Sequence, residues 1–248
     1  MILAIETSTN ICSISFQDAK GAIFEKRTER KGSHSELLFL FIRELMEEQN
    51  FKMEDLDTLL VSSGPGSYTG LRIAASAVKG MLFGLKVDIY AGNTLAGFAQ
   101  SAEEGMVHAV INARRKHLYH QQFEKGDRLT PITKPEILEL VEINDLLKDG
   151  DQIIGTGIDR LDEEKRDGLT IIEEQQISAT NLISLFNSFS GDVFFQQTTA
   201  EELESNYLSS SQVNNTKVKK ILEGLFPALA QAFPSIRDAM LNSTEAQY

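Results

Sequence analysis

Apolar and polar positions change period several times in the first hundred residues, and each change predicts an element. Residues 2–5, 11–16 and 22–26 are short, rich in β-branched or apolar residues and separated by polar turns, which predicts three strands. The first strand is apolar on both faces, a pattern typical of a central strand that is covered on both sides. The chain therefore begins as a small sheet.

Helical periods follow these strands. Ser33 and Glu36 have the S-x-x-E spacing of a capping box, which predicts a helix from there to about Asn50. The next expected elements are strands at 57–62 and 86–90 and helices at 71–85 and 94–101. This order predicts an α/β fold, with helices packed against a mixed sheet.

Beyond residue 100 the pattern is less regular. The expected elements there are a hairpin of strands 107–112 and 118–123, a strand at 152–155, and helices at 181–189 and 217–232. The acidic stretch 101–105 contains a glycine and is the expected boundary between two parts. We therefore expect an N-terminal subdomain of residues 1–103 and a smaller, divergent C-terminal subdomain of residues 104–248.

Two of the expected helices carry more apolar surface than one core requires. The apolar residues of 37–46 cover an arc of roughly 200°, whereas a surface helix needs about 100°. In 71–85 large side chains gather on one side and small ones on the other, so a second helix could approach closely. This predicts a protein interface, and the alternative is a helix sandwiched inside its own domain. The expected interface residues are Phe39, Leu40, Ile73, Ser76, Ala77, Gly80, Phe83 and Gly84.

Composition narrows the classes of function. The 24 Lys and Arg against 36 Asp and Glu give a net charge of −12, which argues against a broad basic surface for nucleic acid. Any RNA contact is therefore expected to be local or made through a partner. Residues 114–116, Arg-Arg-Lys, are the one compact basic cluster: a solvated hairpin tip by default, and otherwise the best local candidate for RNA.

The single cysteine and the short apolar runs bear on location. Cys12 cannot form an intramolecular disulfide or a cysteine-based zinc site, which favours a reducing, cytoplasmic location. The N-terminus lacks the pattern of a secretory signal, and the longest apolar run, 37–42, is far below the roughly 20 residues that span a bilayer. We therefore expect a soluble protein with no membrane partner.

Two turns of the chain are candidates for contact with a phosphate group. The first strand ends in an acidic residue and hydroxyls, which can face a phosphate and its magnesium but also favour turns through their own hydrogen bonds. The glycine-rich loop 64–70 precedes a helix N-terminus, yet it matches neither the P-loop pattern nor G-x-S-x-G. The weak candidates for nucleotide or phosphate contact are Glu6, Thr7, Ser8, Gly64, Gly66 and Ser67.

Histidine spacing does not predict a metal site. No H-E-x-x-H or H-x-x-x-H pair occurs, and His117 and His120 are three apart, which places them on opposite faces of a strand. His34, at the start of the first helix, is expected to be a surface or capping residue. We therefore assign no catalytic residue and no metal ligand.

Several blocks of the chain, in order and spacing, resemble the bacterial TsaB (YeaZ) family over roughly residues 1–98. They are residues 1–9 (Met-Ile-Leu-Ala-Ile-Glu-Thr-Ser-Thr), 34–38 (His-Ser-Glu-Leu-Leu), 64–73 (Gly-Pro-Gly-Ser-Tyr-Thr-Gly-Leu-Arg-Ile) and the pair Lys79-Gly80. Farther on, Asn112-Ala113-Arg114 resembles the family's Asp-Ala-Arg with an amide in place of the acid. Tyr207-Leu208, after Asn206, resembles its Tyr-Leu.

The resemblance implies two subdomains of the actin-like, ribonuclease H-like (ASKHA) fold. It also implies a catalytically silent subunit of the machinery that places threonylcarbamoyl on the adenosine beside the tRNA anticodon. Such a subunit pairs with the metal-dependent TsaD transferase, is joined by the TsaE ATPase, and forms homodimers when alone. The pairing surface would be the first two helices. ATP and the metal would be used by the partners, this chain would hold no tightly bound cofactor, and tRNA would be reached indirectly.

Two enzymatic alternatives remain at this stage. An actin-fold ATPase or kinase would use Glu6, Thr7 and the loop 64–70, although the family resemblance places Glu6 where nucleotide-hydrolysing relatives have an aspartate. A metallopeptidase, suggested by older naming of the family, would need metal ligands that the sequence lacks.

Overall fold

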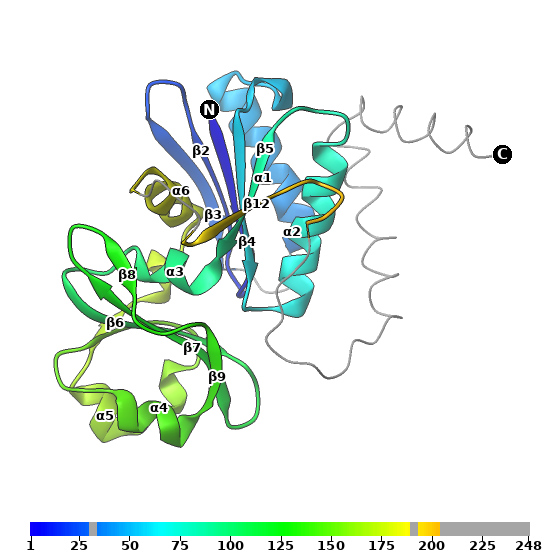
Figure 1. Ribbon diagram of the computed structural model, residues 1–248. Helices are drawn as coiled ribbons and strands as arrows, with labels where there is room; N and C mark the ends of the chain where they lie inside the picture. Colours follow the sequence, from blue (N-terminus) through cyan, green and yellow to red (C-terminus); the bar gives the residue numbers. More distant parts are fainter. Residues whose placement is uncertain (30–33, 189–192, 204–248) are drawn as a thin grey trace.

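The computed structural model describes residues 1–29, 34–188 and 193–203, which form two β-sheets with helices packed on them (Figure 1). Ser33, the expected helix 217–232 and the pair Tyr207-Leu208 lie outside these residues. Within the described ranges, no helix is both long and apolar enough to cross a bilayer.

The first sheet has the strand order β12-β5-β4-β1-β2-β3. β1, β4 and β5 are parallel, and the other strands are antiparallel to their neighbours. Its strands are β1 (Ile2–Glu6), β2 (Cys12–Gln17), β3 (Ile23–Thr28), β4 (Thr58–Gly64), β5 (Asp88–Asn93) and β12 (Phe195–Thr198). The sequence pattern predicted all of these except β12, with shifts of a few residues at their ends.

The second sheet has the order β11-β10-β6-β7-β8, and β9 also pairs with β7. Its strands are β6 (Gly105–Asn112), β7 (His117–Lys125), β8 (Leu129–Pro131), β9 (Glu136–Glu139), β10 (Gln152–Gly155) and β11 (Thr170–Ile172). The predicted hairpin and the strand at 152–155 are confirmed. The three short strands β8, β9 and β11 were not predicted from the sequence.

Helices cover both faces of the first sheet, with α1 and α2 on one face and α3 and α6 on the other (Figure 1). The α-helices are α1 (His34–Gln49), α2 (Tyr68–Met81), α3 (Thr94–Ala99), α4 (Leu140–Leu146), α5 (Glu163–Asp167) and α6 (Ala179–Ser188), with short 3-10 helices η1 (Met53–Asp55), η2 (Ile158–Arg160) and η3 (Glu174–Gln176). The α/β class with flanking helices is confirmed, whereas α4 and α5 were not predicted.

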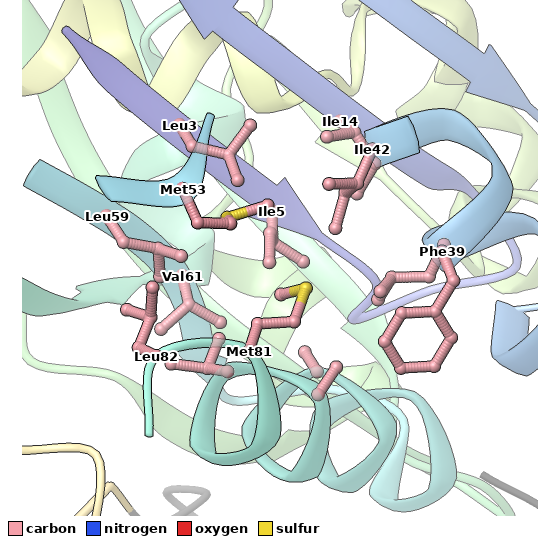
Figure 2. Close-up of a cluster of buried hydrophobic side chains, with 14 of the residues drawn as sticks. Leu3, Ile5, Ile14, Phe39, Ile42, Met53, Leu59, Val61, Met81 and Leu82 are labelled. Carbon is pink, nitrogen blue, oxygen red and sulfur yellow. The ribbon is translucent and has the colours of Figure 1, made fainter. Parts of the chain in front are cut away.

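Alternate residues of β1 enter two different hydrophobic clusters. Leu3 and Ile5 belong to the cluster under α1 and α2, which also contains Phe39 and Met81 (Figure 2). Ala4, between them, belongs to the cluster formed with α3, α6 and the second sheet. Because strand side chains alternate between faces, an all-apolar strand is covered on both sides, as the sequence predicted.

The expected helix 71–85 is wrong at both ends. Its first turn begins at Tyr68, because Ser67 caps it and its Oγ accepts from Gly70 N at 3.3 Å. Its last helical residue is Met81, and Gly84 has a φ of +76°, in the left-handed region that ends helices. Gly84 is therefore not part of the helical face to which the sequence analysis assigned it.

The described part of residues 104–248 contributes to both sheets. α6 packs on β1 and β2, and β12 pairs with β5. These two segments therefore complete the layers of the first sheet, although they follow the second sheet in the chain.

Candidate functional site

The turn after β1 and the loop between β4 and α2 pack directly on each other at the carboxyl end of the first sheet. Ser67 N donates to Ser8 O at 2.6 Å, and Thr7 Oγ1 donates to Gly70 O at 3.0 Å. A Cβ on Gly66 would lie 2.7 Å from Ser8 O, and one on Gly70 would lie 1.9 Å from Thr7 O. The two segments predicted to share a site are thus brought together, and only glycine allows their backbones to approach this closely.

The carboxylate of Glu6 is occupied by its own surroundings. Glu6 is 2% exposed, and its Oε1 accepts hydrogen bonds from Ser8 N at 2.6 Å and Ser8 Oγ at 2.5 Å. Its other oxygen, Oε2, accepts from Ser62 Oγ. Burial raises the pKa of Glu6, and the hydrogen bonds from the two serines oppose this rise only in part.

These residues do not fit a bound nucleotide. A magnesium-bound phosphate needs carboxylate oxygens and backbone N–H groups that open to solvent. Here Thr7 and Ser8 are 0% exposed, and Ser67 N and Glu6 are engaged within the protein. Gly64 N likewise donates to Thr94 Oγ1 at 3.1 Å.

The predicted interface residues divide by exposure. Phe39, Ile73 and Ala77 are at most 5% exposed and belong to the hydrophobic cluster under α1 and α2. Gly80 is also buried. Leu40 and Ser76 are half-buried, Gly84 is exposed, and Phe83 is 52% exposed. Of the predicted residues, Leu40, Ser76, Phe83 and Gly84 are therefore accessible, although Phe83 and Gly84 follow Met81, the last residue of α2.

His34 is not the surface residue that the sequence suggested. It begins α1 but is 8% exposed, and its Nε2 lies 3.0 Å from the carbonyl oxygen of Ile11. Burial lowers the pKa of His34. Its contact ties the start of α1 to the beginning of β2, which is a structural role.

A buried histidine pair was missed. His108 Nδ1 and His120 Nε2 are 3.0 Å apart, and His108 Nε2 lies 3.1 Å from Asp151 Oδ2. Burial lowers the pKa of both histidines, that of His120 to about 3, so both are neutral at pH 7. The turn at 113–116 places Val110 opposite His120. His108 is two residues before Val110 and therefore lies on the same face of the sheet as His120, so this register alone would have predicted that the two histidines share a face.

The other histidine prediction is confirmed. His120 is fully buried, whereas His117, on the opposite face of β7, is half-buried and lies 3.8 Å from Glu139 Oε1. Across the described residues, no group of three or more His, Cys, Asp or Glu side chains could hold a metal ion.

A hollow lies away from all these residues, at the opposite end of the strands of the first sheet. Its volume is about 1010 Å³, and it is lined by the starts of β4 and β5, the segment after α2 and the end of β12. Acidic residues such as Asp55, Asp88 and Glu201 dominate its polar lining, with Lys86 among them. No function was predicted from the sequence for this end of the sheet.

Comparison with known proteins gives the family. Residues 14–231 match the model of the TsaD family, tRNA N6-adenosine threonylcarbamoyltransferase. The tRNA threonylcarbamoyladenosine biosynthesis protein TsaB of Bacillus subtilis is 28% identical over 154 residues, which cover 61% of this chain and 67% of that protein. Its counterpart in Escherichia coli is 26% identical over 148 residues, covering 55% and 64%. The chain thus spans about two thirds of the length of these relatives.

Solved structures agree on the fold. A Pseudomonas aeruginosa protein described as similar to peptidase YEAZ superposes with a TM-score of 0.71 at 25% identity, covering 84% of this chain and 99% of that one. YeaZ from the same organism gives a TM-score of 0.69 at 24% identity with the same coverage. The two sheets with flanking helices described above are therefore a fold of the actin-like ASKHA type. The chain therefore belongs to the TsaB (YeaZ) family of proteins related to the TsaD threonylcarbamoyltransferase.

Proposed function

We propose that this chain is the TsaB-type subunit that supports transfer of threonylcarbamoyl to the adenosine beside the tRNA anticodon, and that it acts through a partner. The family match over residues 14–231 and the TsaB relatives support the pathway. The observation that carries the non-catalytic role is the closed contact between the Glu6 turn and the loop 64–70. In this contact the groups that would hold a phosphate bind each other instead.

The partner in this proposal is a TsaD-type transferase, docked on the side of α1 and α2 that faces away from the sheet. Phe39, Ile73 and Ala77 hold the two helices on the chain's own core, so that the surface they support is rigid. Phe83 and Leu40 then offer apolar contact area beside the small residues of α2. Binding would favour the active conformation of the transferase if this surface fits that conformation better than the inactive one.

Two further assemblies belong to the same proposal. A TsaE-type ATPase would join the pair and use ATP, so that this chain itself needs no tightly bound cofactor. When the transferase is absent, the same face would pair with a second copy of this chain, because an exposed apolar surface such as that around Phe83 favours self-association.

Reconstitution tests the proposal directly. Purified chain is mixed with a TsaD-type transferase, a TsaE-type ATPase, ATP, a threonylcarbamoyl donor and unmodified tRNA, and modified adenosine is measured by mass spectrometry. We expect modification that depends on the chain. Equal modification without the chain would show that the proposal is wrong.

The competing function is an actin-fold ATPase or kinase at the Glu6 turn. Calorimetry of the isolated chain with Mg-ATP separates the two, because an ATPase of this fold would bind at micromolar concentration and release phosphate. The observed packing of Gly66 and Gly70 against Ser8 and Thr7 favours the subunit role. A metallopeptidase, the other alternative, would need a group of metal ligands, and across the described residues no group of three or more His, Cys, Asp or Glu side chains could hold a metal ion.

A further inference from the structure

Cations from two segments gather at one end of the second sheet. Arg114, Arg115 and Lys116 form the exposed turn between β6 and β7. Arg160 of η2 lies beside this turn, because its Nη1 donates to Asn112 Oδ1 at 2.7 Å and to His117 O at 3.3 Å. The turn that the sequence analysis noted as a basic run of three is therefore part of a larger basic surface, in a chain whose net charge is −12.

The turn holds its arginines in a costly backbone conformation. Arg114 and Arg115 have φ values of 73° and 50°, in the left-handed region where side chains other than Gly, Asn and Asp cost about 1–2 kcal/mol each. Asn-Gly is the sequence that two consecutive left-handed residues in a hairpin favour. Arginine at both positions is thus unfavourable for the turn itself, which indicates that the side chains serve another purpose.

The same turn is fixed rather than loose. Arg114 N donates to Asn112 Oδ1 at 2.9 Å, and His117 N donates to Arg114 O at 3.1 Å. Asn112 therefore binds both the turn and Arg160, and it does so without adding a negative charge. A fixed turn loses less entropy when its side chains bind a ligand.

The surroundings leave these cations available. Within the described ranges, no ion pair joins Arg114, Arg115 or Lys116 to a carboxylate, and the nearby Glu139 lies against His117 instead. Asp159 is the neighbour of Arg160 in sequence. Tyr119 is half-buried close to Arg114, so an aromatic ring adjoins the basic surface.

We propose that Arg114, Arg115, Lys116 and Arg160 contact the sugar-phosphate backbone of the tRNA that the complex modifies. This inference rests on the proposed function. Guanidinium groups match phosphate oxygens in a bidentate manner, and phosphate contacts set the position of a nucleic acid without reading its sequence. Because the basic surface is compact and the rest of the chain is acidic, the contact with tRNA would be local. In this proposal the chain touches tRNA directly, whereas the sequence led us to expect that tRNA is reached only through the partner subunit.

The test removes the charges while improving the turn. The variant Arg114→Asn, Arg115→Gly, Lys116→Gln places favourable residues at the left-handed positions, so loss of binding cannot be attributed to unfolding. The complex of chain and transferase is titrated against fluorescein-labelled unmodified tRNA between 50 and 200 mM salt. We expect roughly tenfold weaker binding or more near 100 mM, and a slope of log K against log salt that is shallower by about 2–3.

A matched control removes three positive charges elsewhere. Lys20, Arg128 and Lys134 are exposed and form no ion pair within the described residues, so their joint replacement by glutamine should leave tRNA affinity and salt slope close to wild type. Equal tRNA binding by the turn variant and this control would overturn the inference. So would a turn variant that binds tRNA normally but no longer binds the transferase, since the surface would then contact protein.

The inference and the proposed function fail in different ways. If wild-type chain restores modification and the turn variant matches it in KM for tRNA, only the inference is wrong. If wild-type chain restores nothing, the proposed function is wrong whatever the turn variant does.

Discussion

At the scale of single residues, Gly70 shows how closely the two halves of the candidate site meet. Glycine inside a helix normally costs about 1 kcal/mol relative to alanine. At this position a Cβ would lie 1.9 Å from the backbone oxygen of Thr7, and backbone cannot move aside as a side chain can. We therefore expect Gly70→Ala to destabilise the protein by about 3 kcal/mol, measured by urea unfolding.

Gly126 supplies the control for that prediction. A Cβ there would meet no heavy atom within 4 Å, so Gly126→Ala should change the free energy of unfolding by less than about 0.5 kcal/mol. Similar unfolding midpoints for the two variants would contradict the close approach of the loop to the β1 turn.

The buried histidines make a second residue-scale prediction, concerning pH. Burial lowers the pKa of His120 to about 3 and also lowers that of His108, while the unfolded chain takes up these protons near pH 6.5. The unfolded state therefore binds more protons between these values. Stability is fully present above pH 6.5 and falls as the pH drops below it. His120 contributes a loss of about 1.4 kcal/mol per pH unit down to about pH 3, and His108 adds a loss in the same direction.

His120→Gln separates this effect from other titrating groups. Glu6 acts in the opposite sense, because its raised pKa makes the folded state bind more protons at acid pH. The difference in the free energy of unfolding between wild type and variant therefore reports the contribution of His120. We expect this difference to shrink by about 2 kcal/mol from pH 7 to pH 5. The charged residues around the pair, Asp151, Lys148 and Glu136, are present in both proteins. Parallel stability curves for the two proteins would show that His120 is not buried as a neutral group.

The sequence predicted the environment of single residues correctly where that environment depends on one local segment of the chain. The opposite faces of His117 and His120 follow from strand period alone. The burial of His34 against Ile11 depends on a contact between residues 23 apart, which no local pattern encodes. Predicting that His108 lies beside His120 would have required the register of the hairpin, although the turn of this hairpin was already recognised.

At the scale of elements, α3 depends on a single cap. Asn93 Oδ1 accepts from Leu95 N at 3.0 Å and Ala96 N at 3.2 Å, and Asn93 Nδ2 donates to Gln121 Oε1 of β7 at 2.8 Å. The cap thus also joins the two sheets. We expect Asn93→Ala to cost about 2 kcal/mol and Asn93→Ser, which keeps a cap but loses Gln121, to cost about 1 kcal/mol, both by thermal unfolding.

The order of these two variants is the test at this scale. Equal losses would mean that the contact with Gln121 contributes everything, and no loss would mean that α3 is held by burial alone. α3 is short and buried along its length, so the cap supplies partners for backbone groups that water cannot reach.

Element boundaries were predicted less well than element types. Every strand of at least four residues in the first hundred positions was recognised as a short run of apolar or β-branched residues between polar turns. The end of α2 was not, since Gly84 was taken as a small interfacial residue when its left-handed φ follows the end of the helix. Helix α4, of seven residues, was not predicted.

At the scale of the whole molecule, the first sheet is completed by β12, which lies more than 100 residues from its partner β5. After the second sheet the chain returns through α6, which packs on the first sheet. The chain therefore passes between the two sheets more than once. No local pattern in residues 195–198 predicts this pairing, because Phe-Gln-Gln-Thr carries little apolar signal. The family resemblance supplied the two-sheet architecture that periodicity could not.

The accessible part of the α1 and α2 face makes the last prediction, which concerns association. Phe83 is 52% exposed next to the end of α2, and aromatic residues of this kind contribute most to interfaces. We expect Phe83→Ser to weaken binding to a TsaD-type transferase 10- to 100-fold while leaving thermal stability near wild type. Val141→Ser, which removes a side chain 66% exposed on α4 of the second sheet, should leave binding unchanged. Isothermal calorimetry of both variants decides the matter, because equal affinities would place the partner elsewhere on the surface.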